Sequence, residues 1–143
     1  MKIGIINGPN LNSLGYRETN IYGKNSLFDL EKILKEKFNN VAFLFYQSNN
    51  EGLIIDKIYE FSNSCNALII NPGAFSHYSV AIYDAIKAIS IPVIEVHISN
   101  IFKRECFRQN LLTASATKGL IIGFGIYSYV IAVYAILNSF IKD

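Results

Sequence analysis

Lys2-Ile3-Gly4-Ile5-Ile6-Asn7 stands at the start of the chain as an apolar, β-branched run that does not alternate with polar residues. A strand with one solvated face alternates, whereas a strand covered on both faces reads as a continuous apolar run. The run therefore predicts a buried strand of a parallel sheet. Four further runs of this kind follow, at 41–47, 67–70, 92–96 and 119–122.

Helical patterns separate these five runs. Ser26 and Asp29 are typical of a capping box, which predicts a helix from there to residue 38. Apolar residues also recur at helical spacing over 51–62 and from about residue 76 to residue 89. The alternation predicts an α/β fold: one flavodoxin-like domain over residues 1–143, with a doubly wound, five-stranded parallel sheet.

Composition excludes several classes of protein. A chain of 143 residues with 51% hydrophobic and 17% charged residues has the size and core of one folded domain. A net charge of +2 is too small to predict nucleic-acid or membrane binding. Cys65 and Cys106 cannot form a disulfide framework, and no signal-peptide pattern precedes the first run. We therefore expect a cytoplasmic protein.

The uncharged stretch 119–141 is long enough to span a bilayer core of about 30 Å. Gly123-Phe124-Gly125 interrupts it near one end and reads as a turn. We therefore predict a short strand, this turn, and a core helix over 126–140 instead of a membrane span.

Ligands of open α/β sheets bind at the carboxyl ends of the strands, and three non-periodic segments follow strands here. The first, 8–23, is much longer than the usual βα loop of about 2–6 residues, so it predicts a lid over about residues 8–24. The other two are 71–77 and 95–100. Both histidines and all three arginines lie in or beside these segments, although the chain has ten lysines.

Two pairs of residues could carry acid–base chemistry. Glu95 and His97 are two apart on a strand and leave the same face, which suits either an acid–base histidine or a structural pair. Arg17 and Tyr22 share the predicted lid. A nearby guanidinium favours a phenolate that could act as a base, but the same two residues also fit a solvated surface.

The remaining charged residues also leave two interpretations open. His77 is predicted at a helix start, either capping it or beside an anionic ligand. Arg104 and Arg108 share a face on one helical turn, either to bind a ligand or as a solvated surface paired with Glu105. Asp84 lies two turns after His77, on a small-residue face that suits either subunit contact or solvent.

Other kinds of site lack their residues. The segment 8–15 lacks the Gly-Lys-Ser/Thr ending of a phosphate-binding loop, and Gly123 and Gly125 lack the third glycine of a dinucleotide fingerprint. His77, Glu95, His97 and Cys106 do not show metal-ligand spacing. The residues therefore predict no metal site, phosphate-binding loop or dinucleotide fingerprint.

Specific motifs recur along the whole chain, in order: Asn7-Gly8-Pro9-Asn10-Leu11-Asn12, Arg17-Glu18, Tyr22-Gly23, Gln47-Ser48-Asn49, Asn71-Pro72-Gly73-Ala74-Phe75-Ser76-His77, Ile94-Glu95-Val96-His97-Ile98-Ser99-Asn100 and Arg104-Glu105. Together they resemble the type II 3-dehydroquinate dehydratases. The resemblance implies conversion of 3-dehydroquinate to 3-dehydroshikimate and water, the third step of the shikimate pathway in aromatic amino-acid biosynthesis. It further implies an anti elimination through an enolate, without a metal, a Schiff base or any other cofactor.

The resemblance also assigns roles to residues. Tyr22 is expected to accept the C2 proton, with Arg17 stabilising the phenolate and the transition state. His97 is expected to protonate the departing C1 hydroxyl while Glu95 orients it, and Asn10 to hold the water or the enolate oxygen. The expected substrate contacts are Asn71, His77 and Arg108 to hydroxyls, Ile98 and Ser99 to the carboxylate, Arg104 as a second lid arginine, and Asp84 toward a neighbouring subunit's lid. The implied assembly is a homododecamer of trimers.

Some positions depart from the family pattern. Thr19 stands where the lid usually has proline, Tyr78 where threonine is usual, and Tyr83 where arginine is frequent. The run 110–114 replaces a typical His-Ser-Tyr-Leu-Ser. We expect these departures to bear on lid dynamics and assembly contacts, and not on the reaction, because none of them removes a catalytic residue.

Two other functions remain as alternatives. A flavodoxin-like module could carry FMN or a nucleotide without chemistry at His97, and a yellow chromophore would identify it. A decayed homologue could serve only as an assembly partner, but intact Tyr22, His97 and arginines count against that alternative.

Overall fold

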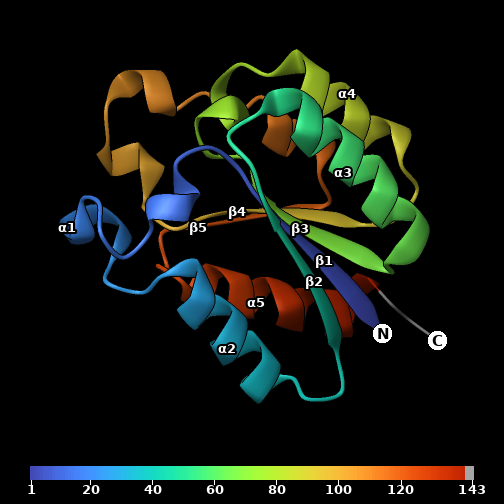
Figure 1. Cartoon of the computed structure of the whole chain (residues 1–143). Helices are drawn as coiled ribbons and strands as arrows, with labels where there is room; N and C mark the ends of the chain where they lie inside the picture. Colours follow the sequence, from blue (N-terminus) through green and yellow to red (C-terminus); the bar gives the residue numbers. More distant parts are fainter. Residues whose placement is uncertain (141–143) are drawn as a thin grey trace.

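The sheet has five parallel strands in the order β2-β1-β3-β4-β5 (Figure 1). The computed structural model describes residues 1–140, so residues 141–143 of the predicted domain lie outside the described residues. The strands are β1 (Lys2–Asn7), β2 (Ala42–Gln47), β3 (Ala67–Asn71), β4 (Val93–His97) and β5 (Gly119–Ile122). The predicted single-domain, doubly wound fold is confirmed, and each strand begins and ends within one residue of its predicted bounds.

The strand order reverses direction at β1. From β1 the chain passes outward to β2, and then returns to pair β3 on the other side of β1. Asn7 and Asn71 are register partners at the carboxyl ends of β1 and β3. Such a switch point opens a crevice at this edge of a doubly wound sheet, where ligands bind.

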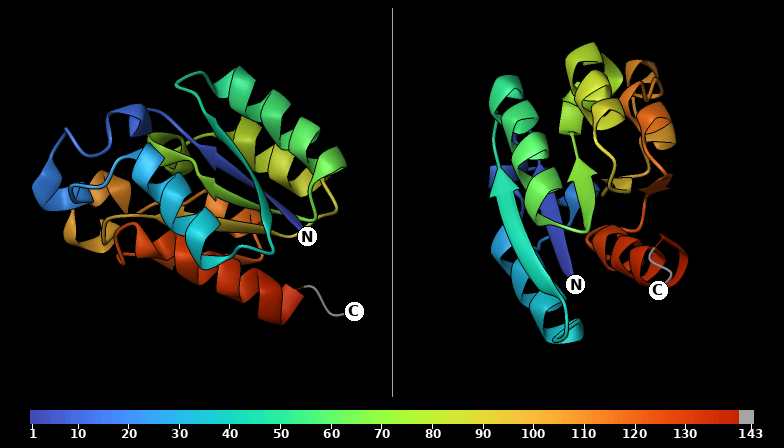
Figure 2. Two further views of the ribbon diagram at one scale, coloured as in Figure 1. Left: turned by 60° about the horizontal axis from the view of Figure 1, so that its bottom comes forward. Right: turned by 90° about the vertical axis from the view of Figure 1, so that its right-hand side faces the viewer.

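Two helices cover each face of the sheet. Helices α2 (Leu27–Lys37) and α5 (Tyr127–Ala135) lie on one face, and α3 (Glu51–Ser64) and α4 (Val80–Ala88) on the other (Figures 1 and 2). The predicted capping box of α2 is present. The Ser26 hydroxyl accepts from the Asp29 amide at 3.2 Å, and the Asp29 carboxylate accepts from the Ser26 amide at 2.8 Å.

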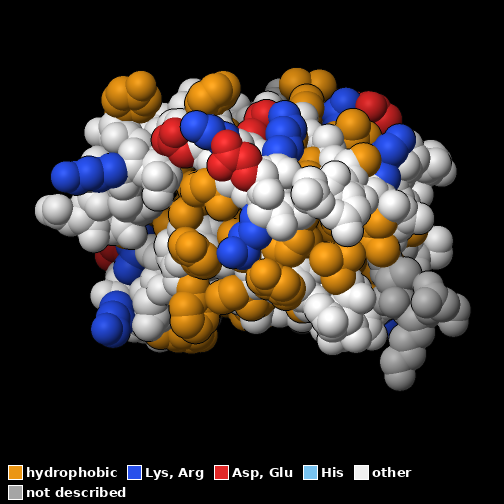
Figure 3. Space-filling view, turned by 90° about the horizontal axis from the view of Figure 1, so that it is seen from below, with side chains coloured by type: hydrophobic (Ala, Val, Ile, Leu, Met, Phe, Trp, Pro, Cys, Tyr) orange, Lys and Arg blue, Asp and Glu red, His pale blue; other side chains and the backbone are white. Residues whose placement is uncertain are grey.

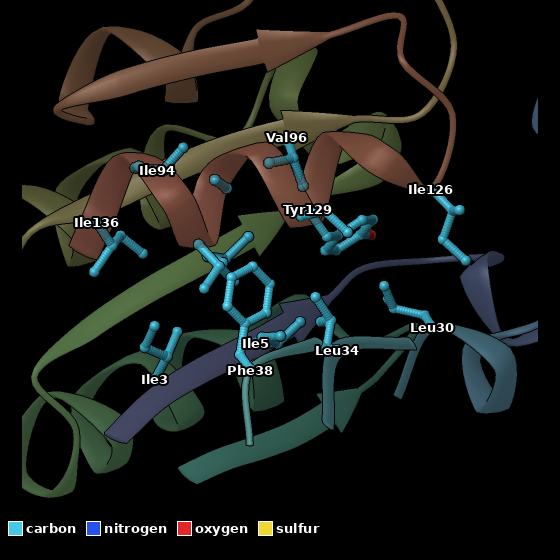
Figure 4. Close-up of a cluster of buried hydrophobic side chains, with 14 of the residues drawn as sticks. Ile3, Ile5, Leu30, Leu34, Phe38, Ile94, Val96, Ile126, Tyr129 and Ile136 are labelled. Carbon is cyan, nitrogen blue, oxygen red and sulfur yellow. The ribbon is translucent and has the colours of Figure 1, made fainter. Parts of the chain in front are cut away.

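Covering both faces explains the continuous apolar runs. Ile3 and Ile5 of β1 join the core under α2 and α5, while Ile6 joins the core under α3 and α4. Figure 4 shows the first of these cores, in which Tyr129 and Ile136 of the C-terminal helical segment face β1 and α2.

The third predicted helix begins later than expected. A 3₁₀ turn, η2 (Gly73–His77), comes first, and α4 begins only at Val80 because the Ser79 hydroxyl accepts from the Ile82 amide at 3.0 Å. The expectation that His77 stands at a helix start is therefore wrong, since it ends η2. His77 and Asp84 consequently do not share one helix face.

Arg104 and Arg108 do not share a helical turn either. Two separate 3₁₀ turns, η3 (Ile101–Lys103) and η4 (Cys106–Arg108), flank an extended Arg104 with φ −105° and ψ −168°.

The predicted lid contains two short helices, the 3₁₀ turn η1 (Leu11–Ser13) and the α-helical turn α1 (Thr19–Tyr22).

The uncharged C-terminal stretch divides as predicted. Gly123 and Gly125 have φ of +89° and +59°, a left-handed backbone that turns the chain from β5 into α5. A π-helical turn, η6 (Ile136–Phe140), continues α5, and Ile141 lies outside the described residues. Within residues 1–140, none of the helices combines the length and the apolar character that crossing a membrane requires.

Candidate active site

A pocket opens at the carboxyl ends of the strands, between the predicted lid, η2 and the segment that contains η3 and η4. Figures 1 and 2 show α1 and this segment side by side at the same end of the sheet. The pocket is lined by Pro9, Asn10, Leu11, Leu14, Arg17, Tyr22, Asn71, Gly73, Ala74, His77, His97, Ile98, Ser99, Ile101, Arg104 and Arg108. Of the predicted site residues, only Glu95 and Asp84 are outside this lining.

The loops after β1 and β3 approach each other closely at Gly8. The Gly8 amide donates to the Asn71 carbonyl at 2.7 Å, and a side chain at Gly8 would overlap the Pro72 carbonyl. The Asn10 amide donates to Asn49 Oδ1 at 3.0 Å, and Asn10 adopts a left-handed backbone with φ +67°. The segment after β2 therefore helps to hold Asn10 at the pocket.

Glu95 and His97 form the predicted pair on one face of β4. His97 Nε2 lies 2.7 Å from Glu95 Oε1, and both side chains are buried. The Thr113 hydroxyl donates to the other carboxylate oxygen, Glu95 Oε2, at 2.6 Å. Because Nε2 is held by Glu95, Nδ1 is the ring nitrogen of His97 left to exchange a proton in the pocket.

Two arginines flank Tyr22, at the end of α1. Arg104 Nη1 donates to the Tyr22 hydroxyl at 2.6 Å, and the Arg17 guanidinium lies 5.0 Å from the centre of the Tyr22 ring. Arg17 also pairs with the Glu18 carboxylate at 2.9 Å, and this hydrogen bond lowers the pKa of Glu18 below its ordinary value. The sequence predicted the neighbouring cation of Tyr22 as Arg17, but the hydrogen bond to its hydroxyl comes from Arg104.

A buried tyrosine that sequence reasoning missed links the ends of β1 and β3. The Tyr129 hydroxyl donates to Asn7 Oδ1 at 2.5 Å and accepts from Asn71 Nδ2 at 3.0 Å. Asn71 Oδ1 in turn accepts from the Gly73 amide at 3.2 Å. Complete burial raises the pKa of Tyr129, so its hydroxyl stays protonated. The orientation of the Asn71 amide is thereby fixed.

His77 is held by Asn110. His77 Nδ1 lies 2.8 Å from the Asn110 carbonyl, and Asn110 Nδ2 donates to the His77 carbonyl at 2.9 Å. A carbonyl only accepts, so Nδ1 carries a hydrogen, and Nε2 is the acceptor of the neutral ring. Desolvation by burial lowers the pKa of His77 below its ordinary value, which favours this neutral form at pH 7.

Arg108 lies in the pocket lining, whereas Asp84 lies outside it. Arg108 lines the pocket, and its Nε donates to the Glu105 carboxylate at 2.8 Å, so it is both a pocket residue and the ion-pair partner expected for Glu105. Asp84 lies exposed on α4, away from the pocket of this chain. Its expected contact with a neighbouring subunit stays a prediction.

The arrangement suits proton transfer at two positions of one ligand. Tyr22, next to two cations, and His97, held by a buried carboxylate, line the same pocket, as a base and an acid of an elimination would. Residues 1–140 contain no cluster of three or more His, Cys, Asp or Glu side chains that could hold a metal ion.

Comparison with known proteins gives one consistent result. The family model described as "Dehydroquinase class II" matches residues 1–137. The chain is 51% identical over 141 residues to a 3-dehydroquinate dehydratase of Clostridium botulinum (strain Okra / Type B1), covering 97% of this chain and 96% of that protein. A 3-dehydroquinate dehydratase of Bacillus cereus (strain AH187) is 52% identical over 140 residues, with 96% of each chain covered. The crystal structure of a type II dehydroquinase from Butyrivibrio crossotus superposes with a TM-score of 0.93 at 46% identity, covering 96% of this chain and 98% of that one.

Proposed function

Because the chain belongs to the dehydroquinase class II family, we infer that it removes water from 3-dehydroquinate to give 3-dehydroshikimate, a step of the shikimate pathway. The observation that carries this inference is the pocket itself, where an arginine-flanked tyrosine and a carboxylate-held histidine line one cavity. The family match does not favour the alternative, a module that carries a flavin or a nucleotide.

The proposed elimination begins at Tyr22. The Tyr22 phenolate takes the C2 proton, and the electron pair of that C–H bond forms an enolate. Arg104, which donates to the Tyr22 hydroxyl, and Arg17, beside its ring, stabilise both the phenolate and the negative charge that develops in the transition state. Asn10 holds the enolate oxygen or a water beside it.

The proposed elimination ends at His97. The enolate collapses to form the C1–C2 double bond while the C1–O bond breaks, and protonated His97 gives its Nδ1 proton to the leaving hydroxyl, which departs as water. Glu95 holds Nε2 and keeps the ring directed into the pocket. The two proton transfers balance, since one proton enters Tyr22 and one leaves His97.

The proposed substrate contacts follow from the lining. His77 Nε2 accepts from a substrate hydroxyl, Asn71 and Arg108 bind further hydroxyls, and the Ile98-Ser99 turn holds the carboxylate. The segment 8–24 is proposed to act as a lid, because it carries Arg17 and Tyr22 and covers one side of the pocket.

The test is absorbance in the band of the conjugated enone of 3-dehydroshikimate, recorded after 3-dehydroquinate is added to the purified chain. A steady rise in proportion to enzyme concentration is the expected result. A yellow protein that binds flavin and gives no rise would support the alternative module instead.

Activity is expected to need neither a metal nor an imine. Among the described residues, no lysine lines the pocket, so a carbonyl substrate has no amine there to condense with. Dialysis against EDTA, and borohydride added with substrate, should each leave the initial rate unchanged. Loss of activity under borohydride, together with added mass on a lysine, would contradict the enolate mechanism.

The chain is proposed to assemble as a dodecamer of trimers. Large apolar side chains are exposed on the face of α2 and α5 (Figure 3), among them Phe28 at 75%, Tyr127 at 57% and Tyr134 at 48%. Exposed apolar groups of this kind mark interaction surfaces. The mean hydropathy of +0.27 is consistent with an assembly in which neighbouring chains cover part of this apolar surface. Light scattering should give a mass that is a multiple of three chains. A stable, active monomer at micromolar concentration would rule out this assembly.

We propose a cytoplasmic location because the two cysteines of the chain are unpaired. Cys65 is buried and Cys106 exposed, and neither forms a disulfide. Unpaired thiols fit a reducing compartment.

A further inference from the structure

Thr113 is a buried residue outside the pocket lining that contacts the acid–base pair. It begins the 3₁₀ turn η5 (Thr113–Ala116), which packs against α4, and its side chain is fully buried. Its hydroxyl lies 2.6 Å from Glu95 Oε2, across 18 residues of sequence.

The two oxygens of Glu95 have different partners. Oε1 lies 2.7 Å from His97 Nε2, and Oε2 accepts from Thr113. Glu95 is completely buried in the middle of β4, where its register partners are Ile70 and Leu120 of the neighbouring strands. Within residues 1–140, no lysine or arginine forms an ion pair with Glu95. Thr113 therefore supplies the second donor that a buried carboxylate needs.

This second donor determines how the carboxylate can turn. A carboxylate that is held at one oxygen can rotate about its last side-chain bond, and the imidazole that is hydrogen-bonded to it then changes its orientation as well. A donor on each oxygen fixes the carboxylate plane, and with it the direction of His97 Nδ1. Outer partners of this kind orient histidine ligands at metal sites, and the same geometry applies to a histidine that transfers a proton.

We propose that Thr113 is a positioning residue for the acid step, which acts on His97 through Glu95 without touching the substrate. This proposal rests on the proposed role of His97 as proton donor. Thr113 lies in the segment 110–114, which departs from the usual family run.

The variant that isolates the hydroxyl is Thr113→Val, because valine keeps the branched shape and removes the donor. We expect kcat for 3-dehydroquinate to fall about 10- to 100-fold, the rate equivalent of one hydrogen bond to a charged group. KM should stay unchanged, since Thr113 does not line the pocket. Thr113→Ser keeps the hydroxyl and should retain most of the wild-type kcat.

Thr117→Val is the matched control. Thr117 directly follows η5, and its hydroxyl contacts the backbone carbonyls of Ala114 and Gly119, at 2.8 and 3.0 Å. Its loss should leave kcat at the wild-type value. If Thr113→Val does not fold, Thr113→Ala compared with Thr113→Ser makes the same comparison, with a low kcat expected for alanine alone.

A double-mutant cycle separates positioning from a merely structural role. In the Glu95→Ala background there is no carboxylate to orient, so adding Thr113→Val should cause no further loss of kcat. A loss that persists in this background, or a Thr113→Val enzyme with the wild-type kcat, would overturn the role of Thr113 while the dehydratase function stands. A wild-type chain that does not dehydrate 3-dehydroquinate would instead overturn the proposed function, and this role with it.

Discussion

Tyr22→Phe is expected to remove nearly all turnover while substrate still binds. Phenylalanine keeps the ring beside Arg17 and Arg104 but has no oxygen to accept the C2 proton. Losing a general base typically costs about 10²- to 10⁴-fold in rate. Initial rates from the enone absorbance should show this loss in kcat, and calorimetric titration with 3-dehydroquinate should still show binding.

Tyr16→Phe is the control for this variant. Tyr16 is a second tyrosine of the segment 8–24, is 88% exposed and is outside the pocket lining, so removing its hydroxyl should leave kcat unchanged. If Tyr22→Phe keeps turnover within about tenfold of wild type, below the usual contribution of a general base, Tyr22 is not the base.

His97→Ala is expected to cause a loss of similar size, about 10²- to 10⁴-fold, because the leaving hydroxyl would have no proton donor. Truncation leaves space beside Glu95 for a small molecule, so added imidazole should restore part of the rate. Steady-state kinetics with and without imidazole measure both effects.

His77→Ala provides the comparison for His97→Ala. His77 lines the same pocket, where Asn110 holds the ring in place and desolvation by burial lowers its pKa and favours the neutral form, so its loss should raise KM more than it lowers kcat. Were the two variants to show the same pattern, with KM raised and kcat retained, the assignment of His97 as the acid would be wrong.

The sheet could be predicted from sequence because its signal is local. Each strand is covered on both faces and therefore reads as an apolar run, and the alternation with helices leaves few topologies. The pairing of Glu95 with His97 was predictable for the same reason, since residues two apart on a strand share a face. The start of α4 was not, because Ser76 and Ser79 are both possible caps and only the fold selects Ser79.

Contacts between segments that are distant in the sequence could not be predicted from such local patterns. Arg104 reaches Tyr22 across 82 residues, and its position depends on the path of a loop between two short 3₁₀ turns. No sequence motif marks Thr113 or Tyr129 as part of the site. A threonine in a loop and a tyrosine in an apolar helix become informative only when packing brings them to Glu95 and Asn71.

The position of Tyr129 near the end of the sequence also bears on when a newly made chain can bind substrate. Every residue proposed to touch the substrate, from Asn10 to Arg108, leaves the ribosome before Tyr129 does. The Asn71 amide reaches its final orientation only when α5 has been synthesised and has docked against β1 and β3, bringing the Tyr129 hydroxyl between Asn7 and Asn71. A nascent chain that already contains every residue proposed to touch the substrate therefore still lacks the contact that orients the Asn71 amide.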